Sequence, residues 1–454
     1  MGEKGRLGKL SLLRGRRKPQ LNSMDFKHQL NEWPPFTELL LLGLQWFAIS
    51  IPGIIIVGKV VSILHNDAIA SQTIYLQKMS FMVSIALFAQ IMWGHRLPLI
   101  LGPSTVLLLG VIASSSFDTS VIYTSIMIGG ATLAIMSFSG IFSYIQRLFT
   151  PRVVAVVLIL IAFTLLPTII DLITTSYRSV PTIANLFFAI MLTACMFLSY
   201  WLVGPLWRST MILWAMIAGS IIYYLIFRQI LSFGALLNEK FTGLFFDNLT
   251  TRWSLEPGVL LSFLFCFFAL SINDLGSIQS MKEIINPSDM PRRINHGITF
   301  TGLANILAGF LGIVGPVNFS LSPGVITATR SASRFTLIPA SLLLCLLSFS
   351  PRLMNFLGNI PSAVIGSSLI YILYFQVAVG KNIVFHTKDD FSPVNTFVIG
   401  IPVLVGTIIA FLPGSSFHLL PNALRPIIGN GFVMGVLSAL ILEHLIFKKN
   451  RTQK

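Results

Sequence analysis

Two short stretches of the sequence combine proline, glycine and hydroxyl side chains within apolar surroundings. Residues 101–106 read Leu-Gly-Pro-Ser-Thr-Val and residues 321–326 read Leu-Ser-Pro-Gly-Val-Ile, so aligning them puts Pro103 opposite Pro323. Proline removes a backbone donor and disrupts a preceding helical turn, and glycine accepts backbone shapes that other residues resist. Each stretch therefore predicts a broken helix. The N–H groups after each break would suit carbonyl oxygens or anions.

Asn273 and Ser277 form a second candidate surface, because residues four apart share one face of a helix. An amide and a hydroxyl can together satisfy the donor–acceptor edge of a planar heterocycle. The alternative for Asn273 is a hydrogen bond to a neighbouring helix inside the membrane. For Asn305 and Asn318, which also lie in apolar stretches, we favour such helix–helix bonding.

Asp274 is the only acidic residue in the apolar segment 257–281. A carboxylate within a membrane is costly and is by default a candidate for function. It lies about 100° around the helix from Asn273. Two functional roles fit it, proton carrier and sodium ligand, and the alternative is an ion pair with a cation such as Lys282. We predict an ion-coupling role.

The composition requires a lipid environment. Of 454 residues, 54% are hydrophobic and only 10% are charged, whereas a soluble protein has about a quarter charged residues. The apolar residues occur in runs of about twenty, the length that crosses a bilayer. The net charge of +15 is spread over short loops and both ends. We therefore predict no nucleic-acid partner, and the three cysteines read as small buried hydrophobic residues.

Fourteen membrane segments are predicted, and their ends are 37–58, 74–94, 98–114, 121–144, 153–173, 182–204, 209–227, 257–281, 296–314, 317–331, 335–350, 361–380, 394–412 and 427–447. With a cytoplasmic N-terminus, 23 of the 31 Lys and Arg residues fall on the cytoplasmic side and 8 on the other. Both termini are thus predicted to be cytoplasmic, in the inner (plasma) membrane, with tails 1–36 and 448–454. The basic N-terminal tail shows no cleavable signal peptide.

The segments divide into two sets of seven, separated by a hydrophilic stretch around 230–256. Because seven is odd, the second set would be inverted relative to the first, as in many secondary transporters. The third and tenth segments are the two that contain the Pro/Gly breaks, and each is predicted to be a short strand followed by a half-helix. A matched pair of broken segments is the sequence feature that best indicates a substrate site near the bilayer midplane.

The second broken segment resembles the signature of the nucleobase–ascorbate transporter (uracil/xanthine permease) family. The similar residues run from Gly324 to Arg330 and continue with Ala332-Ser333-Arg334. Further matches, which together extend over most of 37–447, are Leu44-Gln45, Leu101-Gly102-Pro103-Ser104, Gly302-Leu303 and Ala308-Gly309-Phe310.

The resemblance implies a core domain formed by 37–147 and 257–350. It also implies a gate domain formed by 151–229 and 361–447. The hydrophilic stretch 230–256 is the predicted extracytoplasmic connection between the two halves. Proton- or sodium-coupled uptake by an elevator-type motion is implied as well, and so is a homodimer in the lipid bilayer.

The chain departs from the family pattern at several binding positions, so it reads as a divergent member. Leu321 and Ser322 stand where the family usually has Gln or Glu and then Asn. Asn273 stands where it usually has Glu, Ser277 where it often has His or Asp, and Thr105 where uracil permeases have a stacking aromatic. The usual Gln-His of the first segment is Gln45-Trp46. The substrate-binding residues that we predict are Gln45, Ser104, Thr105, Asn273, Ser277, Ser320, Leu321, Ser322 and Gly324.

The leading hypothesis is therefore a secondary active transporter for a nucleobase-like planar substrate such as uracil or xanthine. The alternative is a small-anion transporter of the benzoate, bicarbonate or sulfate class on the same fold. An intramembrane enzyme is not predicted, because no nucleophile–base pair is found at membrane depth. No metal site or cofactor is predicted either, since no His, Asp or Glu spacing recurs on one helix face. A receptor that binds its ligand without transporting it is a further alternative.

Overall fold

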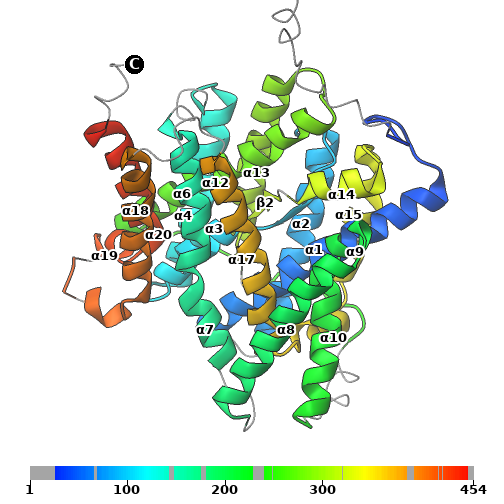
Figure 1. Cartoon of the computed structure of the whole chain (residues 1–454), viewed down its shortest axis with the longest axis horizontal. Helices are drawn as coiled ribbons and strands as arrows, with labels where there is room; N and C mark the ends of the chain where they lie inside the picture. Colours follow the sequence, from blue (N-terminus) through cyan, green and yellow to red (C-terminus); the bar gives the residue numbers. More distant parts are fainter. Residues whose placement is uncertain are drawn as a thin grey trace, which may run out of the picture.

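The computed structural model describes residues 26–65, 69–142, 148–174, 180–228, 240–247, 249–319, 321–385, 393–417, 419–421 and 423–447. The chain forms a bundle of helices around two very short strands (Figure 1). Helices α18, α19 and α20 lie on one side of the bundle, and α1, α2, α14 and α15 lie on the other.

The first half of the chain contains α1 (Phe36–Leu64), α2 (Ile69–Met92), β1 (Leu101–Pro103), α3 (Thr105–Ala113), α4 (Thr119–Phe138), α6 (Pro151–Thr164), α7 (Leu166–Thr174), α8 (Thr182–Leu202), α9 (Pro205–Ser209) and α10 (Met211–Ile226). The short strand β1 and the short helix α3 together occupy the third predicted segment. They follow one another directly, as the Pro/Gly break predicts.

The second half contains α12 (Pro257–Ile284), α13 (Met290–Leu311), β2 (Pro316–Asn318), α14 (Ser322–Thr329), η2 (Arg334–Thr336), α15 (Leu337–Ser348), α16 (Pro351–Gly358), α17 (Ser362–Phe385), α18 (Pro393–Phe411), η3 (Gly414–Phe417), α19 (Arg425–Ile428), α20 (Gly431–Ile441) and η4 (Leu442–Ile446). Strand β2 and helix α14 repeat the strand-plus-short-helix arrangement of β1 and α3.

Each of the fourteen predicted segments overlaps a helix or a strand followed by a helix. Within the described residues, seven helices are long and apolar enough to cross a membrane. An eighth span would arise if the pair 334–348 and 351–358, which is bent by 94°, were counted as one. Three shorter apolar helices accompany them. The chain is therefore a multi-pass membrane protein, and the number of fourteen crossings stays a prediction.

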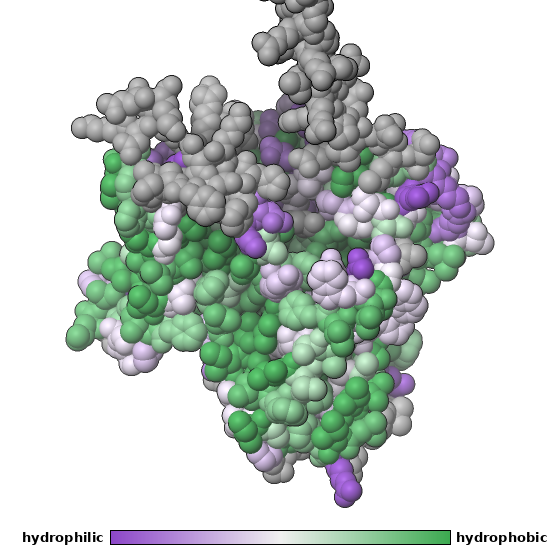
Figure 2. Space-filling view, in the orientation of Figure 1, coloured by the Kyte–Doolittle hydropathy of each residue, from purple (hydrophilic) through white to green (hydrophobic). Residues whose placement is uncertain are grey.

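The surface of the molecule fits a lipid environment. In Figure 2, apolar residues cover most of the visible face, and hydrophilic residues gather toward the upper rim and the lower tip. Large hydrophobic side chains are exposed, among them Phe138, Trp201 and Leu202, which are 87%, 79% and 78% exposed. Exposure of this extent is unfavourable in water and ordinary against lipid.

Strands β1 and β2 pair in antiparallel register, with Leu101 opposite Asn318 and Pro103 opposite Pro316. The two breaks thus meet, although Pro103 and Pro323 hold different places. Pro103 ends β1, whereas Pro323 lies in the first turn of α14, where the missing N–H has no helical partner to lose. The pairing satisfies backbone groups that would otherwise be unbonded in an apolar interior.

Helices α4 and α13 approach each other closely at glycines. A Cβ atom added at Gly302 would lie 2.6 Å from the backbone N of Ala134 and 2.7 Å from the carbonyl O of Gly130. One added at Gly309 would lie 2.7 Å from the carbonyl O of Tyr123. Small residues allow such close backbone contact between membrane helices. The Gly-Leu and Ala-Gly-Phe matches in the ninth predicted segment are thus explained by packing.

An N-terminal strap, residues 26–35, lies along the connection between α14 and η2. The backbone N of Lys27 donates to the carbonyl O of Arg330 (2.8 Å), and the N of Ala332 donates to the O of His28 (2.9 Å). The ring of Trp33 stacks on that of Phe335 at 4.1 Å. The strap is therefore bonded to the segment that follows the second break.

Candidate functional site

The site is formed where α12 and α14 pack against one another beside the paired strands. Both helices leave open space there at a glycine. A Cβ atom added at Gly276 or at Gly324 would have no neighbour within 4 Å, and both residues are exposed. Leu321, which precedes α14, is 43% exposed. These open positions come from the two elements that the sequence identified as carrying the substrate surface.

Asn273 is half-buried on α12. Its side-chain amide makes no hydrogen bond within the part of the chain that the structure describes. Ser277 is on the same face but is fully buried, and its hydroxyl lies 3.1 Å from the carbonyl O of Asn318 and 3.0 Å from that of Asn273. The predicted shared face is therefore split: the amide is available to a ligand, and the hydroxyl is engaged with β2.

Gln45 and Thr105 are both half-buried. The side-chain amide of Gln45 on α1 donates to the hydroxyl of Ser209 at the end of α9, over 3.0 Å. This bond joins elements of the predicted core and gate domains. Ser320 lies outside the described residues.

Ser104 and Ser322 are fully buried, and each accepts a hydrogen bond from the backbone. Ser104 caps α3 by accepting from the N–H of Leu107 over 3.2 Å. Ser322 accepts from the N–H of Ile100 over 3.0 Å and so connects the start of α14 to the residue before β1. In this conformation both hydroxyl groups order the broken backbone.

We expect Ser104→Ala to lower the free energy of unfolding by about 1 kcal/mol, the usual effect of losing an N-cap. Thermal unfolding of the purified protein in detergent measures the effect. Ser116→Ala is the matched control, since Ser116 is exposed. An unfolding temperature equal to that of the control would contradict the capping role.

Asp274 is fully buried on α12 and accepts hydrogen bonds from two other elements. The hydroxyl of Thr301 on α13 donates to its Oδ2 over 2.7 Å. The backbone N–H of Asn318 donates to its Oδ1 over 3.3 Å, and the side-chain amide of Asn318 donates to the same oxygen. Lys282 is not its partner. The carboxylate thus holds β2 against α12 and α13.

This cluster extends to two residues that sequence reasoning did not single out. His95 Nε2 lies 3.1 Å from Asn318 Oδ1, and the amide of Gln90 donates to the hydroxyl of Thr301 over 3.0 Å. His95 falls between the predicted segments 74–94 and 98–114. No local pattern could connect it to Asn318, because 223 positions separate them and only the fold brings them together.

Phe319 was also missed, and it is the aromatic residue nearest to the second break. Its half-buried ring lies across two glycines, such that a Cβ atom at Gly102 would collide with it and one at Gly53 would lie 3.4 Å from its Cζ atom. The sequence signal that could have found it is an aromatic residue that directly follows the predicted strand of a broken segment. It can supply the flat apolar surface that Thr105 does not.

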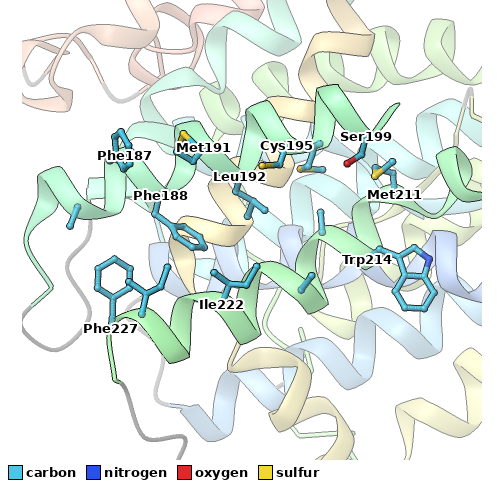
Figure 3. A pocket seen from close by; sticks show the side chains of 15 residues that line it. Phe187, Phe188, Met191, Leu192, Cys195, Ser199, Met211, Trp214, Ile222 and Phe227 are labelled. Carbon is cyan, nitrogen blue, oxygen red and sulfur yellow. The ribbon is translucent and has the colours of Figure 1, made fainter. Parts of the chain in front are cut away.

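A large apolar groove lies elsewhere, between α8 and α10 (Figure 3). It has a volume of about 680 Å³, and its walls include Phe188, Met191, Trp214 and Phe227. Ser199 is the only hydroxyl among its lining residues. A polar heterocycle needs several hydrogen-bonding partners, so this groove does not suit one.

In the described ranges, no three His, Cys, Asp or Glu residues are grouped as metal ligands would be.

Two solved structures resemble the whole fold. The transmembrane domain of the cyanobacterial bicarbonate transporter BicA gives a TM-score of 0.56 at 14% identity, covering 91% of this chain and 98% of that one. The murine anion transporter of solute carrier family 26, member A9, in the inward-facing state, gives 0.59 at 16% identity, covering 91% and 69%. At such low identity the likeness concerns the fold alone.

Several sequence relatives are similar along almost their whole length. A nucleobase transporter of Paenibacillus larvae is 26% identical over 422 residues, which are 90% of this chain and 94% of the relative. The xanthine permease of Bacillus subtilis is 22% identical (90% and 93%), and its uric acid permease PucK is 25% identical (90% and 96%). The model of the xanthine/uracil permeases, described as "Permease family", matches residues 37–415. The chain therefore belongs to this permease family, the nucleobase–ascorbate transporters.

Proposed function

We propose that the protein is a secondary active transporter for a nucleobase-like planar heterocycle such as xanthine or uracil. The observation that carries the proposal is the side chain of Asn273, a half-buried amide with no hydrogen-bond partner in the described chain, beside open space at Gly276. An unpaired amide in an apolar setting is costly unless a ligand or water bonds it. It offers a donor and an acceptor, as the edge of such a heterocycle requires.

We infer the remaining substrate contacts from the residues around the broken segments. The substrate would hydrogen-bond to Asn273 and lie against the ring of Phe319, with its other edge toward Thr105, Leu321 and Gly324. An aromatic ring can stack on any nucleobase, because every base has a flat π face. Phe319 can therefore replace the stacking aromatic that uracil permeases have at the position of Thr105. Ser104, Ser277 and Ser322 act one layer further out, by shaping the backbone around the substrate.

The packing of the helices supports a division into core and gate. Helices α1 to α4, α12, α13 and α15 pack mainly with one another, and so do α6, α7, α8, α10, α17, α18 and α20, whereas α14 contacts both α12 and the predicted gate helix α9. In an elevator-type motion the first set would slide past the second, and the Gln45–Ser209 hydrogen bond between them would break. Coupling to H⁺ or Na⁺, a homodimer and cytoplasmic termini complete the proposal.

The experiment is a thermal-shift screen of the purified protein, followed by uptake into proteoliposomes. We expect xanthine, uracil or uric acid to stabilise the protein, and Asn273→Ala to reduce that stabilisation. Asn185→Ala is the matched control, because Asn185 is a buried amide in the predicted gate whose oxygen already accepts a hydrogen bond from Tyr223 OH (2.7 Å). The control should lose stability and keep its response to the substrate.

Two outcomes would oppose the proposal. Stabilisation by benzoate, bicarbonate or sulfate alone would assign the chain to small-anion transport. An undiminished response to nucleobases in Asn273→Ala would place the substrate elsewhere.

A further inference from the structure

Asp274 is the last acceptor of two converging chains of hydrogen bonds. In one, the amide of Gln90 donates to the hydroxyl of Thr301, which donates to Oδ2 of the carboxylate. In the other, His95 contacts the Oδ1 atom of Asn318, whose Nδ2 atom faces Oδ1 of Asp274. The four groups come from α2, α13, the segment before β1, and β2. Both chains thus end at a single buried carboxylate, which Thr301 and Asn318 contact directly.

The backbone determines which nitrogen of His95 carries the hydrogen. The N–H of Leu97 donates to Nδ1 of His95 over 2.9 Å, so Nδ1 has no hydrogen of its own. The hydrogen of the neutral ring is therefore on Nε2, which donates to Oδ1 of Asn318 at 3.1 Å. That contact turns the amide so that its NH₂ group points at Asp274. His95 consequently fixes a donor to the carboxylate without touching it.

Two arginine side chains bond the backbone on either side of His95. Arg293 on α13 donates to the carbonyl O atoms of His95 and Arg96, both over 3.0 Å, and Arg334 at η2 donates to the carbonyl O of Ile91 over 2.6 Å. Burial of His95, and then the positive charge of Arg293, favour the neutral imidazole. Asp274 itself forms no ion pair among the described residues. A proton arriving at this cluster would therefore bind the carboxylate and would break no salt bridge in doing so.

We propose that Asp274 is the binding site of the coupled proton, and that His95 is the positioning residue that sets its proton affinity through Asn318; this deepens the proposed transport function and rests on it. When the carboxylate takes up H⁺ at one oxygen, that oxygen becomes a donor and is a poorer acceptor. The bonds from the N–H and the side chain of Asn318 then weaken. Phe319 is the next residue, so proton binding reaches the substrate surface through one peptide unit.

The proton site can be observed directly, without substrate. Infrared difference spectra of the purified, substrate-free protein, recorded as the pH is lowered, should show the C=O band of a buried carboxylic acid. The band should be absent in Asp274→Asn. If that variant does not fold, Asp274→Glu should shift the frequency of the band. A band that persists unchanged in both variants would overturn the proposal.

The role of His95 is tested by the pH at which this band is half-formed. His95→Leu should move that midpoint upward by roughly one to two pH units, since a hydrogen bond to a charged group contributes about 1.5–3 kcal/mol and one pH unit corresponds to about 1.36 kcal/mol. His95→Gln, which keeps a donor, should lie nearer the wild type. Asn185→Leu is the control for general damage and should leave the midpoint unchanged. An unmoved midpoint in His95→Leu would leave His95 a merely structural residue.

The proposed cargo and the proposed proton site can be refuted independently of one another. If the wild type takes up no nucleobase but shows the Asp274 band, the proposed cargo is refuted and the proton site is retained. Nucleobase uptake by Asp274→Asn that keeps the wild-type dependence on an imposed pH gradient would refute the proton site and leave the cargo standing.

Discussion

The substitution Gly302→Leu is expected to prevent accumulation of folded protein. The new Cβ would stand 2.6 Å from the backbone N of Ala134 and 2.7 Å from the carbonyl O of Gly130, and these are backbone atoms that cannot rotate away. Helices α4 and α13 would have to separate along their contact. Overpacking of a core, which forces side chains off their rotamers and shifts the backbone, typically costs about 1–3 kcal/mol and occasionally more. Since α13 carries Thr301, the cluster around Asp274 would be disturbed as well.

Size-exclusion chromatography of a fluorescent fusion measures the effect, as loss of the monodisperse peak. The control is Gly400→Leu. Gly400 also lies inside a predicted membrane helix, but a Cβ there meets nothing within 4 Å. Both variants add the same side chain to a helical glycine, so only the neighbouring backbone distinguishes them. A normal peak for Gly302→Leu would mean that the two helices are not held in close contact.

The second large effect is expected at Phe319. Phe319→Ala should weaken nucleobase binding by about 5- to 150-fold, because stacking on an aromatic ring contributes about 1–3 kcal/mol per base. Phe319→Tyr should retain most of the affinity, since it keeps the ring face. Binding is measured as the concentration dependence of thermal stabilisation by xanthine or uracil.

Loss of the Phe319 ring also removes its packing on Gly102 and Gly53, so stability must be separated from binding. Phe188→Ala is the control, because Phe188 is buried in the wall of the groove between α8 and α10. It should lower the unfolding temperature and leave the substrate affinity as in the wild type. Equal affinities for Phe319→Ala and Phe188→Ala would exclude stacking on Phe319.

The sequence predicts the larger elements well, because lipid imposes one strong rule. A run of about twenty apolar residues must be helical, and Pro/Gly breaks must be covered by other backbone. The broken segments at 98–114 and 317–331 therefore appear as strands followed by short helices. The register between the strands could not be derived. Nothing local distinguishes Pro316 from Pro323 as the partner of Pro103, since that choice depends on how α13 ends.

The site is less predictable, because side-chain partners come from distant parts of the chain. The spacing of Asn273 and Ser277 correctly puts both on α12, but it does not reveal that Ser277 is covered by β2. Ser104 and Ser322 could equally have faced a ligand, and it is the backbone of Leu107 and Ile100 that takes their oxygens. Helical spacing assigns a face, and only tertiary packing decides what that face meets.

The N-terminal strap limits how the chain can be shortened or labelled. Lys27, His28 and Leu30 each share a backbone hydrogen bond with the stretch from Arg330 to Arg334. A deletion that starts protein synthesis at α1 would strip these bonds from the loop behind the second half-helix. Purification tags and reporter fusions at the front of the chain are therefore best joined before residue 26, with the strap left whole.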